Sequence, residues 1–299
     1  MKYAYIILLI FLFSSCKIDN PKVELQDIEK SEEALPLPKD SVQANEKDIK
    51  DLGKSLSIEF KQKELIEKKD QRSAYQKLII DKRYVEEHKD YKINFKYPLL
   101  NESLKRTHVN FNNFITNYYV NIKTTISEIK INKMLCDSVT AANFREERFI
   151  DYKIYVVNDQ LVSVLFYKEN FYSGAMHPSY SFDAFNFDLN RGVFMNFEDF
   201  FNQGSEEEVL NILNRKITSN IQDSNMYYDC WEVSSSDFFA SKNNFVINDD
   251  VVEFYFDDCV MCPSHTGSYS IELPLVELLS VLKKSNSNPL VFNVKSDRN

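Results

Sequence analysis

Two closely spaced cysteines and a nearby histidine are the residues whose pattern most directly indicates chemistry. Cys259 and Cys262 form a C-x-x-C pair, and His265 follows three residues later. Thiolate and imidazole are zinc ligands, so this group could hold a metal if Cys136 or Cys230 supplied a fourth ligand. A redox role is weaker, because a redox C-x-x-C opens a helix, whereas this one follows an expected strand. One hypothesis is therefore a metal- or thiol-dependent enzyme.

The amino-terminal residues predict export and lipid attachment. After Lys2, residues 3–13 form an apolar run that is typical of a secretory signal and too short to span a bilayer. The four residues Phe13-Ser-Ser-Cys16 resemble the lipobox of bacterial lipoproteins, with Phe13 where leucine is usual. The resemblance implies cleavage before Cys16 and acylation of its thiol by fatty acids such as palmitate, which would anchor the protein to a lipid bilayer. We expect residues 1–15 to be a signal peptide and the folded part to lie in the cell envelope outside the cytoplasm, at the outer membrane if the host is Gram-negative.

Disulfide bonds are the favoured interpretation of the remaining cysteines. If Cys16 is acylated, an even number is left, namely Cys136, Cys230, Cys259 and Cys262. In an oxidising compartment such thiols pair, which predicts two bridges and leaves three pairings open. Residues three apart on a strand point to opposite faces, so Cys259 and Cys262 would bridge each other only if the chain bends there, as Pro263 allows.

Composition and charge narrow the classes of function. The net charge of −9 becomes −10 if the single positive charge of Lys2 leaves with the signal, which disfavours binding to nucleic acid and would attract a basic partner. The five glycines are too scattered for a phosphate-binding loop, and the four histidines form no H-E-x-x-H pair. No G-x-S-x-G sequence is present either. We therefore expect no cofactor.

Composition divides the rest of the chain into four segments. Residues 16–54 hold three prolines, many charges and few large apolar groups, which predicts a flexible tether, with a short helix near residues 45–56 as the alternative. Residues 55–150 and 151–283 are aromatic-rich and are expected to form the two halves of the folded part. Residues 284–299 are a polar tail.

Strand and helix patterns together predict an α+β fold. Alternation of apolar residues indicates strands at residues 56–60, 91–100, 152–157, 161–166, 182–189, 193–197, 245–248, 251–256 and 270–273. Apolar residues spaced three and four apart predict a helix over residues 111–129. The capping-box pattern from Ser205 to Glu208 predicts the start of a second helix, and Pro274 is expected to begin a third that ends near residue 282. Because hairpins separate the helices, we expect an antiparallel sheet built from hairpins with three main helices packed on it.

An ordered series of short motifs resembles a known family of exported domains. The series comprises Val162-Ser-Val164, Phe171-Tyr-Ser-Gly-Ala-Met-His-Pro178, Phe185-Asn-Phe-Asp-Leu189, Gly192, Phe197-Glu-Asp-Phe-Phe201, Pro263-Ser-His-Thr-Gly267 and Ile271-Glu-Leu-Pro274. It resembles, over about residues 91–282, the uncharacterised domain of the lysozyme-sensing anti-sigma factor ectodomain and of the non-catalytic region of a peptidoglycan deacetylase (RsiV/PdaC-like). Ala175 and Met176 stand where that family usually has glycine and alanine, and Ser264-His265 where it has Tyr-Ala. If the loop needs positive φ at both positions 174 and 175, Ala175 costs roughly 1 kcal/mol or forces another turn.

The resemblance implies a binding ectodomain with no catalysis of its own. It places the candidate binding residues in two loops, and these residues are Tyr172, Gly174, His177, Pro263, His265 and Gly267. His177 could contact a ligand or act as a base, but a hydrogen bond within its own loop is the favoured interpretation. The expected partner is a basic extracytoplasmic protein such as lysozyme, or peptidoglycan. The alternative remains an envelope enzyme that uses Cys259, Cys262 and His265.

Overall fold

The computed structural model describes residues 77–136, 138–157, 160–248, 250–263, 266–267, 269–284, 288 and 290. Several predicted features lie outside these residues: the signal peptide, Cys16, the tether at residues 16–54, the strand at residues 56–60, His265 and most of the tail at residues 284–299. All of the described residues belong to one compact unit, Asn45–Asn299.

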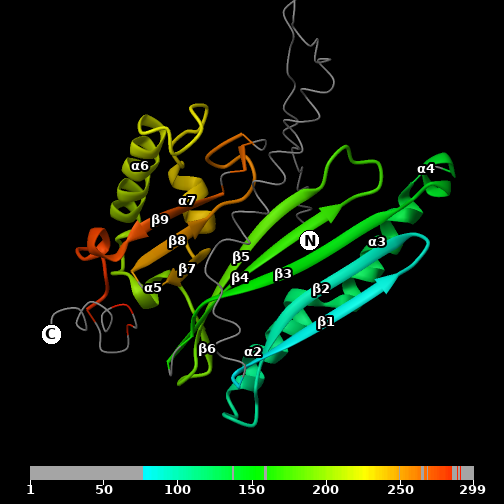
Figure 1. The fold of residues 1–299 in the computed structure, drawn as a ribbon, viewed down its shortest axis with the longest axis horizontal. Helices are drawn as coiled ribbons and strands as arrows, with labels where there is room; N and C mark the ends of the chain where they lie inside the picture. Colours follow the sequence, from blue (N-terminus) through cyan, green and yellow to red (C-terminus); the bar gives the residue numbers. More distant parts are fainter. Residues whose placement is uncertain are drawn as a thin grey trace, which may run out of the picture. The chain divides into compact units, whose positions relative to one another are not determined.

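A six-stranded sheet forms the first part of the fold (Figure 1). Its strands, in spatial order, are β1 (Ile79–Glu87), β2 (Tyr91–Leu100), β3 (Glu146–Val157), β4 (Leu161–Phe171), β5 (Ser179–Asp188) and β6 (Val193–Met195). All neighbours are antiparallel except β2 and β3, which run parallel. The hairpin predicted around residues 158–159 is confirmed as β3 and β4. The predicted boundary between residues 150 and 151 falls inside β3, so this sheet contains residues of both expected halves.

Helical segments supply the crossover that the parallel pair requires. They are α2 (His108–Phe114), the π-helix η2 (Ile115–Val120), α3 (Ile122–Leu135) and α4 (Ser138–Ala142). The helix predicted over residues 111–129 is therefore present but interrupted, because η2 changes the helical period and Asn121 has a φ of +23°. Phe111, Ile115 and Ile129 are buried as predicted, whereas Tyr118 is 77% exposed.

A three-stranded antiparallel sheet forms the second part of the fold. Its strands are β7 (Phe245–Asn248), β8 (Val251–Tyr255) and β9 (Ser270–Pro274). The helical elements of this part are α5 (Phe197–Phe200), α6 (Glu206–Gln222), α7 (Ser235–Ser241) and the 3₁₀ turn η4 (Leu275–Leu278). The α+β class is thus confirmed, although the strands divide between two sheets.

Two helix predictions in this part need correction. α6 begins where predicted, but the Ser205 side chain accepts no capping hydrogen bond, and its hydroxyl donates to the carbonyl of Asn202 at 2.7 Å. Pro274 opens only the short turn η4, because the chain then leaves the helical path and Leu282 pairs with Phe201 in a β-bridge.

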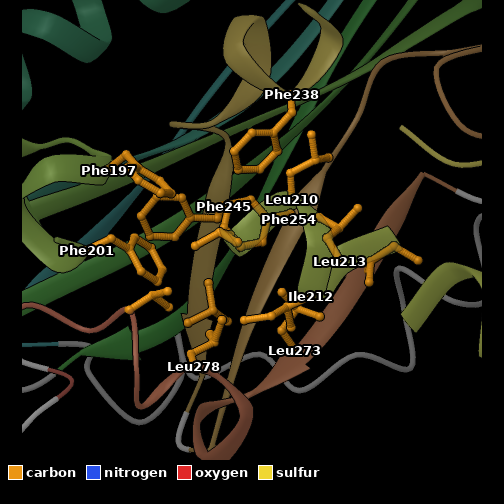
Figure 2. Close-up of a cluster of buried hydrophobic side chains, with 14 of the residues drawn as sticks. Phe197, Phe201, Leu210, Ile212, Leu213, Phe238, Phe245, Phe254, Leu273 and Leu278 are labelled. Carbon is orange, nitrogen blue, oxygen red and sulfur yellow. The ribbon is translucent and has the colours of Figure 1, made fainter. Parts of the chain in front are cut away.

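Phenylalanine rings and aliphatic side chains together fill the core beneath the second sheet. In Figure 2 the rings of α5, α7, β7 and β8 converge with leucine and isoleucine side chains of α6. The labelled residues are Phe197, Phe201, Phe238, Phe245, Phe254, Leu210, Ile212, Leu213, Leu273 and Leu278, and none is more than 6% exposed. Each such side chain contributes about 1.5–3 kcal/mol by leaving water, so this cluster fixes how α6 and α7 pack on the sheet.

Side-chain hydrogen bonds join the two sheets. Asn244, just before β7, accepts from the backbone N–H of Ala184 at 2.7 Å and donates to the carbonyl of Phe182 at 2.8 Å. The N–H of Ile247 donates to the hydroxyl of the buried Ser163 at 2.9 Å. These bonds satisfy backbone groups that the packed faces would otherwise leave without water.

Within the part of the chain that the structure describes, no helix combines the length and the apolarity needed to cross a membrane.

Candidate functional site

The first predicted loop forms the tip of the β4–β5 hairpin. It turns back where the N–H of Ala175 donates to the carbonyl of Tyr172 at 3.0 Å, with Gly174 at a φ of +84°. Ala175 is not among the residues with positive φ, so the loop needs left-handed backbone at one position only. The strain that two such positions would impose on Ala175 therefore does not arise.

Side chains of this loop face solvent. Tyr172 is 44% exposed and Met176 is 89% exposed. Nδ1 of the exposed His177 lies 3.2 Å from the carbonyl oxygen of Pro178, a hydrogen bond within the loop of the kind favoured for this residue. A Cβ added at Gly174 would meet no atom within 4 Å, so the surface beside it is open.

A buried ion pair supports the base of the loop. Glu146 and Arg148 pair with each other on β3, at 2% and 7% exposure. The guanidinium carbon of Arg148 lies 4.2 Å from the centre of the Tyr172 ring, and its Nη1 donates to the carbonyl of Phe171 at 3.3 Å. Asn132 donates to the Glu146 carboxylate at 3.2 Å. Buried charges of this kind are tolerated only with such partners, so the position of Tyr172 is coupled to the interior of the protein.

The second predicted loop lies between β8 and β9. The backbone N–H and the hydroxyl of Thr266 both donate to the carbonyl of Pro263, at 3.0 and 2.8 Å. Gly267 is buried and has a φ of +76°, which explains the glycine there. His265 lies outside the described residues.

The stems of the two loops meet in an aromatic cluster. The rings of Phe182 on β5 and Tyr269, at the start of β9, are 5.0 Å apart. Burial, and then the charges of Glu169 and Asp258, raise the pKa of Tyr180 to about 12. This phenol therefore stays protonated even where an ordinary tyrosine, with a pKa of 10, would ionise.

The cysteines form one disulfide bond in the part of the chain that the structure describes. Cys230 and Cys262 are joined, with a sequence separation of 32. Cys136 is partly exposed and Cys259 is exposed, and both are free thiols, so the prediction of two bridges is wrong. Cys136 lies at the end of α3, whereas Cys230, Cys259 and Cys262 belong to the second part of the fold.

The two cysteines of the C-x-x-C pair therefore differ, because one is in a disulfide bond and the other is a free thiol. Cys262 is bonded to Cys230, and Cys259 sits in a turn at a φ of +62°. Among the described residues, which include all four candidate cysteine ligands but not His265, no group of three or more histidine, cysteine or acidic side chains is arranged to hold a metal ion.

Sequence reasoning missed one exposed group, in the loop between α6 and α7. Tyr227, Tyr228 and Trp231 are 39%, 72% and 42% exposed. Trp231 is the single tryptophan of the chain, and it follows a cysteine between two helices. Three aromatic residues close together in a short segment between two helices were the available signal.

Comparison with known proteins places the fold. No family model matches the sequence, and no curated protein matches it either. Two solved structures are similar. One is a DUF3298 family protein from Pseudomonas aeruginosa PAO1, with a TM-score of 0.50 and 10% sequence identity, and the alignment covers 71% of this chain and 95% of that protein. The other is a DUF3298 family member from Bacteroides fragilis NCTC 9343, with a TM-score of 0.48 and 16% sequence identity, and the alignment covers 73% of this chain and 96% of that protein. Through the Pseudomonas structure, the comparison shows that this chain shares its fold with a protein of an uncharacterised domain family.

Proposed function

We propose that this protein is a membrane-anchored envelope lipoprotein whose α+β domain binds an extracytoplasmic partner without catalysis. The partner is a basic, lysozyme-like protein or the glycan of the cell wall. The membrane anchor is the acylated Cys16. The two loops at residues 172–178 and 263–267 form the binding surface, as the resemblance to the RsiV/PdaC-like family implies.

The support of Tyr172 by the Glu146–Arg148 pair is the observation that carries this proposal. An exposed aromatic ring that is backed by a buried, hydrogen-bonded guanidinium is held in one orientation before a partner arrives. Such preorganisation lowers the entropic cost of binding. Tyrosine in this setting also offers apolar area together with a hydroxyl that can hydrogen-bond a protein or a sugar.

The disulfide supports the location. A bridge between Cys230 and Cys262 persists in the oxidising envelope and is rare in the reducing cytoplasm. The acidic net charge of −9 supports a basic partner, because it favours approach of positively charged proteins.

Retention on two immobilised partners tests the proposal. The full chain is passed over a basic lysozyme and over peptidoglycan, each at low and high salt, and Tyr172→Ala and His177→Ala are compared with the exposed control Tyr118→Ala. We expect retention that falls with salt and is weakened by Tyr172→Ala but not by the control. Retention of the wild type by neither partner would contradict the proposal.

The anchor is tested separately in the native host. Labelling with a fatty-acid analogue should mark the wild type and leave Cys16→Ser unlabelled. Labelling of both variants, or of neither, would remove the anchor from the proposal.

The enzyme alternative depends on Cys259, which is an exposed thiol. For Cys262 to join it as a ligand or a redox partner, the bond to Cys230 must first be reduced. Zinc content and free thiols measured on the purified protein decide this alternative. Bound zinc that is lost in Cys259→Ser would favour the enzyme.

A further inference from the structure

The loop that joins α6 to α7, whose backbone Figure 1 shows, carries three exposed aromatic side chains. We call Tyr227, Tyr228 and Trp231 the aromatic patch. The rings of Tyr227 and Tyr228 are 4.5 Å apart, and Tyr228 is 72% exposed. Tryptophan and tyrosine in such positions leave apolar area in water, which marks surfaces that another molecule covers.

The aromatic patch is fixed to the rest of the domain on both sides. Cys230, between the patch residues, is bonded to Cys262, and the N–H of Trp231 donates to the carbonyl of Met261 at 2.8 Å. Two residues later, Val233 and Asn214 of α6 exchange hydrogen bonds at 2.9 and 3.0 Å. The loop is thus ordered before binding, and little conformational entropy is left to lose.

The same bonds place the patch beside the proposed binding surface. Cys262 directly precedes Pro263, the first residue of the second predicted loop. The disulfide therefore joins the aromatic patch covalently to the segment that leads into that loop. The patch extends the surface on which the proposed function depends.

The patch lies in an acidic stretch of the chain. The stretch from Asp223 to Asp237 contains four acidic residues and no lysine or arginine. Asp229 and Glu232 flank Cys230 and Trp231, and their side chains are exposed. Within the described part of the chain, neither forms an ion pair with a lysine or arginine, and Glu232 only accepts a hydrogen bond from the Thr218 hydroxyl at 3.2 Å. Both carboxylates are left to attract cations of a partner.

We infer that the aromatic patch and its carboxylates are the docking surface for lysine and arginine side chains of a basic protein. This inference rests on the proposed function and names the partner class and the contact residues. A guanidinium or ammonium group stacks on the face of tryptophan or tyrosine, and a neighbouring carboxylate pairs with the same charge. A sugar polymer would also stack on the rings, but it gains nothing from the net negative charge.

The single tryptophan allows a direct test at the patch. A short oligo-arginine peptide without tryptophan is titrated into the full chain while the emission of Trp231 is followed. We expect a saturable change in emission. In the double variant Asp229→Asn/Glu232→Gln the apparent Kd should rise roughly tenfold, because the peptide loses the two carboxylates that pair with its charges. Glu207→Gln, an exposed carboxylate on the first turn of α6, is the control and should bind like the wild type. An unchanged Trp231 signal, or equal affinity of the double variant and the control, overturns the inference.

Binding of a whole protein provides the second test. Retention on a basic lysozyme is compared for the wild type, Tyr228→Ala/Trp231→Ala and Tyr118→Ala, and circular dichroism checks that each variant is folded. We expect the double variant to lose roughly tenfold or more in affinity, as for truncated interface aromatics, with no loss in the control.

The outcomes separate this inference from the proposed function. If the wild type and the double variant bind lysozyme equally, the aromatic patch is not the docking surface and the proposed function stands. If the protein is retained on peptidoglycan but not on lysozyme, and neutralising the carboxylates leaves that retention unchanged, the surface binds glycan and the inference is wrong. If the protein is retained on neither partner, the proposed function and the inference fail together.

Discussion

Arg148 stacks on Tyr172 from one side and pairs with the buried Glu146 on the other, so one guanidinium links the interior of the six-stranded sheet to an exposed loop. A change at Arg148 should therefore affect both stability and the loop.

We predict that Arg148→Ala lowers the free energy of unfolding by about 3–5 kcal/mol, because it leaves Glu146 buried without its counter-charge. Urea denaturation of both proteins measures this. Arg145→Ala is the matched control, since Arg145 is 43% exposed and pairs with the exposed Glu87, and it should unfold near the wild-type midpoint. Equal destabilisation by the two substitutions would show that burial of the pair is not what matters.

Two glycines with positive φ offer a matched pair of substitutions. Gly174→Ala should cost roughly 1–2 kcal/mol from the left-handed backbone alone, since no atom lies within 4 Å of the new Cβ. Gly192→Ala has the same backbone penalty, and its Cβ would also lie 2.5 Å from Cβ of Thr107, which should add about 1–3 kcal/mol. Thermal unfolding of the two variants checks the order. A Gly174 variant less stable than the Gly192 variant would contradict the contact with Thr107.

The cysteine assignment predicts a thiol count. In a Cys16→Ser chain that is denatured without reductant, two thiols should react, those of Cys136 and Cys259. Cys230→Ser should lower the free energy of unfolding by about 2–4 kcal/mol, because it opens the loop that the bridge closes. Cys136→Ser, which breaks no bridge, is the control. A count of zero would mean that Cys136 and Cys259 are also bridged.

Lys242 links two helices through charge and predicts a pH dependence. Its Nζ donates to Glu206 at 2.9 Å and also to Glu198, and these hydrogen bonds lower the pKa of both carboxyl groups below the ordinary 4.5. Because the folded-state values are lower, the stabilisation is complete above pH 4.5 and is lost as the pH falls through the folded-state pKa values.

The variant Lys242→Met should therefore be less stable than the wild type by about 1 kcal/mol near pH 7, and the difference should shrink below pH 4.5. The pKa of Lys242 itself is raised above 10.5, so no change is expected between pH 5 and 9. Denaturant midpoints across this range provide the measurement. A difference that is constant down to pH 3 would mean that the contact of Lys242 with Phe197, and not its bonds to the two carboxylates, provides the stabilisation.

Much of the fold was predictable where one face of a strand or helix is buried. The strand β2 follows the predicted residues 91–100, and α6 begins directly after Ser205, where the capping-box pattern predicted a helix. Alternation and helical spacing report local burial, however, and not the direction of a neighbouring strand. The parallel pairing of β2 with β3 is set by the crossover, which local patterns do not describe.

The candidate site was predictable in part. The loop at residues 172–178 was found because its motif resembles a family, and Gly174 has the backbone that a turn glycine provides. Arg148 was missed because burial of a charge depends on partners from β3 and α3. The sequence also left the pairing of Cys230 with Cys262 undecided among three possibilities, because the spacing of cysteines does not say which thiols meet in the fold.

The strand β1 was not predicted, because its sequence is mostly charged and only Ile79 is buried. Among the described strands it forms one edge of the six-stranded sheet, and the three-residue β6 forms the other. Unpaired backbone at a sheet edge recruits strands of other chains and leads to aggregation, which exposed charges and short strands prevent. The exposed charged side chains of β1 therefore disfavour pairing of this edge with strands of other protein molecules, which would otherwise build a fibre. These residues are Asp81, Lys82, Arg83 and Glu87.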